Sequence, residues 1–457
     1  MLRAVAKLTG AVTLCLVVGL SALAEEKKVT LSPDELREAA ALALRAGDAP
    51  RAYAFSEALL QRDETDRTAL LIHSRSARDL GRYHVAKASA RSAWKLAETD
   101  EQKFSSSMVM AQALSSDGKR TYAQLWLRRA AHHAPNEQMS QIAARDFRYV
   151  RARNPWLTQL NFSVTPDSNI NNGSAERSSF LYRGPWVRET VHSGTARPLS
   201  GVEYSLGVNT RYRFAETGTR AHDLTFYGQY RTYTLSSEAK AQAPSATGSD
   251  FAFGEYMLGY AHKGINLDRR GEYRLSGRVG QNWYGGDEYS RFFRLSGGQF
   301  FRLKEGRSVR VRVSGERLFG VTRSDADTVR TDFSYSFPLP TGAAVWTNLT
   351  LAKSDSTVEI DDYQAVGLQA QVELAKPVFG ATALIGLSAQ DKRYDASVFG
   401  PPRQEETVAA SFTLIFRQID YYGFNPTMRI SGSNTDSNIN RYKAKRFGVN
   451  FGIQSAF

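Results

Sequence analysis

The spacing of apolar residues changes once along the chain, near Asn154 and Pro155. Upstream, from Ser32 to about Arg153, alanine and leucine recur every three or four residues, which predicts helices. From Trp156 onward, apolar and polar residues alternate in runs that are bounded by turn residues, which predicts strands. The sequence therefore predicts an α + β chain in which a small helical domain (residues 25–153) precedes a large β domain (residues 154–457).

The alternating runs predict fourteen strands in the β domain. They are expected near residues 157–165, 200–215, 219–235, 250–262, 271–285, 289–303, 308–321, 327–337, 343–354, 362–375, 380–393, 405–419, 422–432 and 444–457. The connections alternate between short and long, as in an outer-membrane barrel with both termini in the periplasm. A soluble two-sheet sandwich is the alternative, but many runs are long for one. We therefore expect a 14-stranded antiparallel transmembrane β-barrel with the helical domain beneath its periplasmic mouth.

The two ends of the chain indicate export to a Gram-negative outer membrane. Two basic residues precede an apolar stretch that ends in Ala22-Leu23-Ala24, which predicts a signal peptide over residues 1–24. At the other end, Phe451, Ile453 and Phe457 lie on the apolar face of an alternating run. A final barrel strand with this pattern and a terminal aromatic residue is the form that the barrel-assembly machinery recognises. We expect that machinery and outer-membrane lipid to be partners of this chain.

The helical domain contains three glycines at similar spacing, Gly47, Gly81 and Gly118, separated by 34 and 37 residues. An alanine follows five positions after each of them. A glycine between two helices, with small residues where the helices cross, indicates a helical-hairpin repeat. The Leu80-Gly81-x-Tyr83 step resembles a tetratricopeptide repeat. An irregular helical bundle is the alternative.

The chain is basic, with a formal net charge of +13. Export and the absence of any binding motif argue against nucleic acid, so anionic headgroups or an acidic partner are favoured. Strand alternation places six arginines inside the barrel: Arg211, Arg213, Arg274, Arg278, Arg310 and Arg312. They could pair with acidic residues on neighbouring strands, or they could form a cationic conduit. We find no nucleophile elbow, zinc-binding helix or phosphate loop, so we predict no enzyme, cofactor or resident metal.

A pentapeptide, Asp-Ser-Asn-Ile-Asn, occurs after the first predicted strand and again after the thirteenth. Its candidate functional residues are Asp167, Asn169 and Asn171 in the first copy and Asp436, Asn438 and Asn440 in the second. The first and last strands of a closed barrel are neighbours, so both copies should lie at the external end of the seam. They could be ordinary turns. They could also form a latch that hydrogen-bonds across the closure or binds a cation.

These features together resemble the Slam family, the surface lipoprotein assembly modulators. The resemblance rests on the signal peptide, the tetratricopeptide-like domain, the segment Pro166–Asn171 that opens a barrel of about 300 residues, and the second copy before the final strand. It implies an outer-membrane translocation or assembly factor that delivers specific client lipoproteins, or secreted haem- or metal-binding proteins, to the cell surface. The alternative is an outer-membrane channel for small solutes or polysaccharide export.

Overall fold

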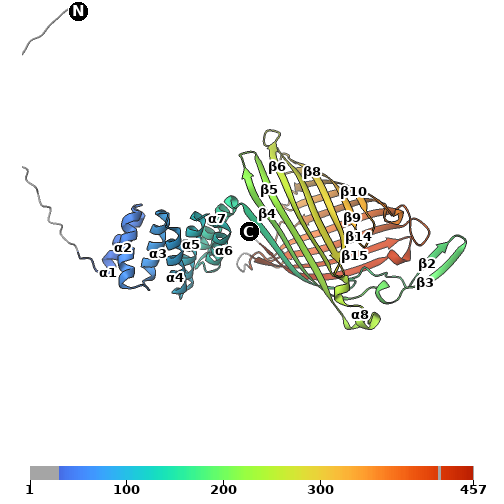
Figure 1. Cartoon of the computed structure of the whole chain (residues 1–457), viewed down its shortest axis with the longest axis horizontal. Coiled ribbons are helices and arrows are strands. Elements are labelled where there is room, and N and C mark those ends of the chain that lie inside the picture. Colours follow the sequence, from blue (N-terminus) through green and yellow to red (C-terminus); the bar gives the residue numbers. More distant parts are fainter. Residues whose placement is uncertain (1–29, 420–423, 456–457) are drawn as a thin grey trace, which may run out of the picture.

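The computed structural model describes residues 30–419 and 424–455. A stack of helices leads directly into a closed barrel (Figure 1). In the described part of the chain, every helix is too short or too polar to cross a membrane. The predicted signal peptide and Phe457 lie outside the described residues.

Seven helices form the part of the chain between residue 30 and the barrel. They are α1 (Pro33–Arg45), α2 (Ala49–Arg62), α3 (Arg67–Asp79), α4 (Tyr83–Lys95), α5 (Asp100–Ser116), α6 (Arg120–His132) and α7 (Glu137–Arg153). Five of them begin where a side-chain oxygen accepts a backbone N–H of the first turn, which stabilises the helix start. The capping residues are Ser32, Asp48, Asp66, Thr99 and Asn136.

The three glycines lie between paired helices, as predicted. Gly47, Gly81 and Gly118 have φ angles of 77°, 74° and 75°, the left-handed conformation that glycine adopts without strain. The alanines five positions later, Ala52, Ala86 and Ala123, are fully buried. The helices therefore form three successive hairpins, and α7 follows the last one.

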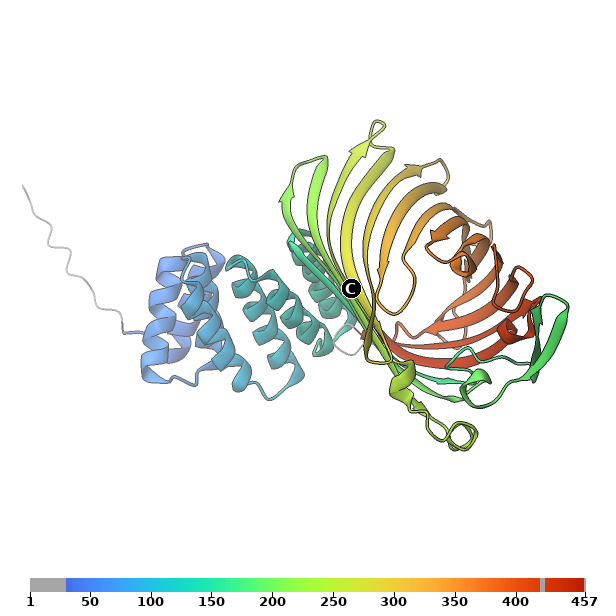
Figure 2. The same ribbon diagram turned by 45° about the vertical axis from the view of Figure 1, so that its right-hand side comes forward.

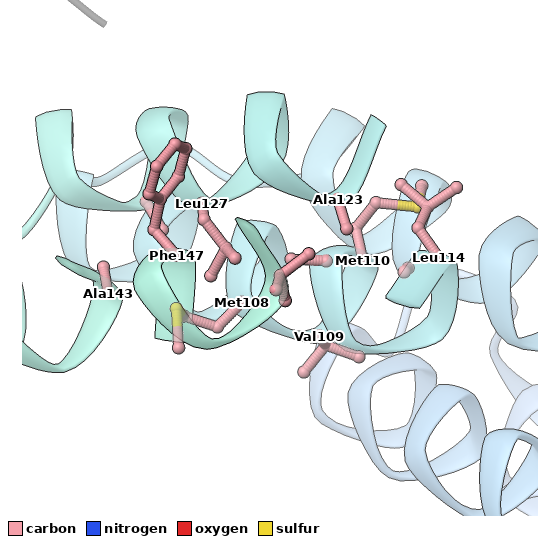
Figure 3. Packing of buried hydrophobic residues seen from close by; sticks show 12 residues of the cluster. Met108, Val109, Met110, Leu114, Ala123, Leu127, Ala143 and Phe147 are labelled. Atoms are coloured by element: carbon pink, nitrogen blue, oxygen red, sulfur yellow. The ribbon is translucent and has the colours of Figure 1, made fainter. Parts of the chain in front are cut away.

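The largest core cluster of the stack joins α5, α6 and α7 (Figure 3). Met108, Val109 and Met110 of α5 are buried beside Leu127 of α6 and Phe147 of α7. Burial of such side chains stabilises by about 1.5–3 kcal/mol each. The helix that enters the barrel is thus packed into the stack.

Fourteen antiparallel strands close the barrel, so the predicted fold is confirmed. They are β1 (Trp156–Asp167), β4 (Gly201–Glu216), β5 (Arg220–Leu235), β6 (Phe253–Asn266), β7 (Gly271–Tyr284), β8 (Asp287–Arg302), β9 (Ser308–Gly320), β10 (Ala326–Pro338), β11 (Ala344–Ser356), β12 (Tyr363–Glu373), β13 (Thr382–Tyr394), β14 (Gln404–Ile415), β15 (Phe424–Ser437) and β16 (Ala444–Ser455). Each pairs with its neighbour in sequence, and β1 pairs with β16 to close the ring.

The segment predicted as one long loop, residues 166–199, contains a hairpin instead. Strands β2 (Ser178–Arg183) and β3 (Trp186–Val191) pair with each other and not with the barrel. The hairpin lies at one end of the barrel (Figures 1 and 2), where Tyr182 N donates to the carbonyl of Phe399 at 3.0 Å in the loop between β13 and β14. The next long loop also carries structure of its own, the short helix α8 (Ser237–Gln242).

The barrel strands present apolar side chains outward and small or polar ones inward. On β8, Leu295 is 55% exposed on the outer surface, whereas the next residue, Ser296, lines an internal cavity. The exposed outer side chains include Leu206, Leu224, Leu258, Leu275, Val279, Val313, Val329, Leu351, Val366, Leu368, Leu387, Val408 and Phe451. An apolar outer band of this kind is what a barrel presents to lipid.

Candidate functional site

The junction between the helical stack and the barrel is short and hydrogen-bonded. Only Asn154 and Pro155 separate α7 from β1. The buried Asn154 donates from Nδ2 to Thr121 Oγ1 at 3.0 Å, and its Oδ1 accepts from Trp156 N at 3.2 Å. The carbonyl of Pro155 accepts from Arg213 N of β4 at 2.8 Å. The stack is therefore attached to the barrel rim at the end where β1 begins (Figure 1).

A second contact joins α6 to another part of the same rim. The guanidinium of Arg128 lies over the ring of Phe424, the first residue of β15, with 5.3 Å between Cζ and the ring centroid. A cation over an aromatic face is attracted by the ring quadrupole. The stack thus contacts the rim on both sides of the β1–β16 seam.

The first pentapeptide lies at the opposite end of β1, against β16. Asp167 faces Gly448, and its carboxylate pairs with the guanidinium of Arg446. The N–H of Ser168 donates to the carbonyl of Phe447 at 3.0 Å, and Ser168 Oγ accepts from Phe447 N at 2.9 Å. These bonds join β1 to β16 beyond Pro166, which has no N–H to donate to the strand pairing.

Asn169 is fully buried, and its side chain makes three hydrogen bonds. Its Nδ2 donates to the carbonyls of Gly173 and Lys445, at 3.0 and 3.1 Å, and its Oδ1 accepts from Gly173 N at 2.8 Å. Asn171 forms hydrogen bonds on the other side of β1. Its Nδ2 donates to the carbonyls of Thr195 and Arg197, just before β4. The first copy therefore binds the segments on both sides of β1, namely β16 and the residues just before β4.

The second pentapeptide makes contacts of the same kind from β15. Asn438 accepts from Gln404 N at 2.9 Å and donates to the carbonyl of Pro402 at 2.8 Å, which fixes the start of β14. Asn440 donates from Nδ2 to the carbonyl of Ser178 at 3.1 Å. Asp436 pairs with Lys443 at 3.2 Å and is exposed.

The two pentapeptides lie at the same barrel end and are joined through an intermediate residue. Ser174 Oγ, five residues beyond Asn169, donates to the carbonyl of Asn440 at 2.6 Å. Within the described ranges, 30–419 and 424–455, no group of three or more His, Cys, Asp or Glu side chains is arranged to hold a metal ion. Ser174 therefore links the two copies by a hydrogen bond at this end of the barrel.

One wall of the lumen is strongly basic and borders a cavity of about 830 Å³. Of the six arginines singled out from the sequence, five line this cavity: Arg211, Arg274, Arg278, Arg310 and Arg312. The sixth, Arg213, is ion-paired with the buried Asp223 on the adjacent strand at 2.9 Å. Three further cations line the same cavity, Lys263, Arg294 and Arg330. Strand alternation did not single out Lys263 and Arg330, although both occupy inward positions of their strands.

The ion-pair interpretation fits Arg213 but not the other five arginines. In the part of the chain that the structure describes, no carboxylate lies within 4.0 Å of the charged nitrogens of those five side chains, although such pairs form elsewhere on the same wall. Arg294 pairs with Glu316, and Arg330 with Asp332. Arg213 is therefore ion-paired, and the other five arginines have no carboxylate partner among the described residues.

The closed barrel, with its apolar outer band and polar interior, defines an outer-membrane β-barrel protein. The chain belongs to the surface lipoprotein assembly modifier family, whose model matches residues 156–454. This match confirms the resemblance to Slam proteins. The family assembles lipoproteins at the cell surface and is not enzymatic.

No curated protein matches the chain significantly. Among solved structures, OccK7 of Pseudomonas aeruginosa is 9% identical with a TM-score of 0.33, covering 65% of this chain and 98% of that one. OprB of Pseudomonas putida is 9% identical with a TM-score of 0.36, covering 67% of this chain and 96% of that one. At this level neither similarity carries functional information.

Proposed function

We propose that this protein delivers a particular client, a lipoprotein or a secreted haem- or metal-binding protein, from the periplasm to the cell surface. In this proposal the helical stack lies in the periplasm and captures the client, and the barrel provides the route across the outer membrane. The barrel-assembly machinery inserts the barrel, and outer-membrane lipid surrounds its apolar band. Family membership supports the general role, and the rest is our inference.

The observation that carries this proposal is the fixed attachment of the stack to one mouth of the barrel. A stack tied by a long flexible linker would raise the local concentration of a client without orienting it. Here Asn154 and the carbonyl of Pro155 bond to the stack and to β4, and Arg128 contacts Phe424 across the rim. A client held on the stack is therefore held beside the lumen. Stacked helical hairpins form extended surfaces suited to such a client.

An insertion experiment tests whether this attachment matters. A linker of about ten Gly and Ser residues placed between Asn154 and Pro155 leaves both parts of the chain present but uncouples them. The matched control carries the same linker between Pro244 and Ser245, in the loop after α8. Candidate clients encoded beside the gene are co-expressed, and their exposure on intact cells is measured with added protease.

We expect the junction insertion to reduce client display while the amount of heat-modifiable barrel stays the same, and we expect the control insertion to preserve display. Equal display by both insertions would contradict a role for the fixed junction. Changed uptake of small solutes, with every surface protein in place after gene deletion, would favour the channel alternative.

A further inference from the structure

We infer that the basic wall of the lumen is a binding site for acidic segments of an extended polypeptide. We call this surface the cationic wall and define it as Arg211, Arg274, Arg278, Arg310 and Arg312. The inference rests on the proposed function, because the polypeptide it names is a client in passage. Beyond the proposed function, it states how the lumen would bind that client, through arginine side chains that pair with client carboxylates.

The cavity beside the cationic wall carries a charge imbalance. Its lining contains eight cationic and four acidic side chains. Three of the acids, Asp223, Glu316 and Asp332, already have an arginine partner. Charged groups held in a low-dielectric wall without counter-charges are costly. The wall therefore favours an anionic ligand.

Arg278 shows the imbalance most directly. The charged groups that act on it most strongly are Arg274, Arg294 and Arg312, all of them cations. Its Nε is buried and has no hydrogen-bond acceptor among the described residues, and the same holds for Nε of Arg211. The described residues therefore do not neutralise these two guanidinium groups, and both line the cavity, where a guanidinium can bind a carboxylate.

Two inward-facing glycines lie beside arginines of the cationic wall. Gly259 lies opposite Arg278 on the adjacent strand, and a Cβ on Gly259 would stand 2.6 Å from Arg278 Cγ. Gly298 lies between Arg274 and Arg312 in the sheet register, and a Cβ there would stand 3.6 Å from Arg312 Cβ. A Cβ at position 259 would also stand 2.6 Å from the carbonyl oxygen of Gly277, so a larger residue there would have to displace both the Arg278 side chain and the backbone of β7.

The spacing of the arginines favours an extended peptide over a single small anion. Arg310 and Arg312 are two residues apart on β9, and Arg274 and Arg278 are four apart on β7. Side chains of an extended polypeptide point to one side at the same two-residue period. Acidic residues at alternate positions could therefore meet successive arginines, whereas a single phosphate would use only one or two of them.

The other arc of the lumen is much less charged. A second cavity of about 500 Å³ there is bordered mainly by small and neutral residues, including Gly386, Ser388, Ala409 and Ser411. Its two arginines are Arg429 and Arg446, and Arg446 is paired with Asp167. A polypeptide attracted to the cationic wall would thus face mainly small and neutral side chains across the lumen. The client segment would therefore be bound by the cationic wall alone and not by the opposite wall of the lumen.

A peptide-binding experiment on the purified full-length protein tests this inference. The probe is a fluorescein-labelled peptide with glutamate at alternate positions and serine between, and fluorescence anisotropy reports binding. The test variant is R278Q/R312Q, which removes two charges from the cationic wall. The matched control is R188Q/R307Q, which removes two charges on β3 and in the turn before β9, away from the cavity.

We expect saturable binding by the natural protein, weakened by about tenfold or more in R278Q/R312Q, because that variant loses charge-assisted hydrogen bonds to the glutamates. The control should bind within about twofold of the natural protein. R278K/R312K, which keeps both charges but loses the guanidinium fork, should bind more weakly than the natural protein and more tightly than R278Q/R312Q. It also serves as the test variant if the glutamine variant fails to give a heat-modifiable barrel, because loss of the guanidinium fork should still weaken binding measurably.

Three results would overturn the inference. One is no saturable binding of the glutamate peptide by the natural protein, whatever the variants do. Another is equal binding of a lysine peptide of the same length. The third is displacement by inorganic phosphate at lower concentration than by unlabelled peptide, which would indicate a phosphate site. Peptide binding by a protein that displays no client would refute the proposed function alone, and display without peptide binding would refute this inference alone.

Discussion

The buried amide of Asn169 gives the sharpest quantitative prediction for the barrel seam. Its side chain makes three hydrogen bonds, one of which reaches the carbonyl of Lys445 on β16. The register between β1 and β16 runs from Asn161 to Val164 and resumes at Asp167. The contacts beyond this gap, including the bond from Asn169 to Lys445, therefore contribute more to the stability of the seam than they would beside uninterrupted strand pairing.

Replacing Asn169 by alanine removes all three bonds and leaves backbone groups buried without partners. Each lost bond costs about 0.5–1.5 kcal/mol, so N169A should lower the free energy of unfolding by about 2–4 kcal/mol. N438A is the matched control, since Asn438 occupies the same place in the second pentapeptide. It makes two bonds and is exposed, so water replaces them, and the loss should stay below about 1 kcal/mol.

Urea titration of the barrel in lipid vesicles, followed by tryptophan fluorescence, measures both values. The expected order of stability is natural protein, N438A, then N169A. If N169A unfolds at the same urea concentration as the natural protein, or if both variants lose the same amount, the pentapeptides are ordinary turns. The latch account would then be wrong.

Two further predictions concern the helical stack. Burial lowers the pKa of His73 below its usual 6.5, so the unfolded state binds a proton more readily than the folded one. The stability of the stack should therefore be fullest above about pH 6.5 and fall as pH drops below it, and H73Q should flatten this slope in hydrogen exchange measured against pH. Phe147 is 2% exposed, so F147A should cost about 3–5 kcal/mol and speed exchange in α7 while exchange in the barrel strands is unchanged. Equal exchange in α7 of F147A and the natural protein would contradict the core assigned to this helix.

The sequence could predict the features that depend on local pattern. Gly81 marks a helix end because only glycine adopts φ 74° without strain, and that signal needs no partner elsewhere in the chain. Strand alternation likewise assigns each residue to the inner or outer face. This is why all fourteen strands and the inward arginines could be located before the fold was known.

Features that depend on register or on distant contacts could not be predicted. Alternation places both Arg211 and Arg213 inward, but only the register puts Asp223 opposite Arg213 and Thr225 opposite Arg211. The bond from Asn169 to Lys445 spans 276 residues, so no local pattern reveals it. The β2–β3 hairpin was missed because its two strands have six residues each and pair only with each other.

Crosslinking of an arrested client tests the central claim, passage through the barrel, most directly. A client fused to a stably folded domain should stall in passage, and a photo-reactive amino acid then reports what touches a chosen position. Ser296 lines the lumen, whereas its neighbour Leu295 is 55% exposed on the outer surface, so the pair differs only in the face that it occupies. Our account predicts a crosslink to the client from position 296 and none from position 295. A crosslink from position 295 alone, or from neither position while the client is displayed, would contradict passage through the lumen.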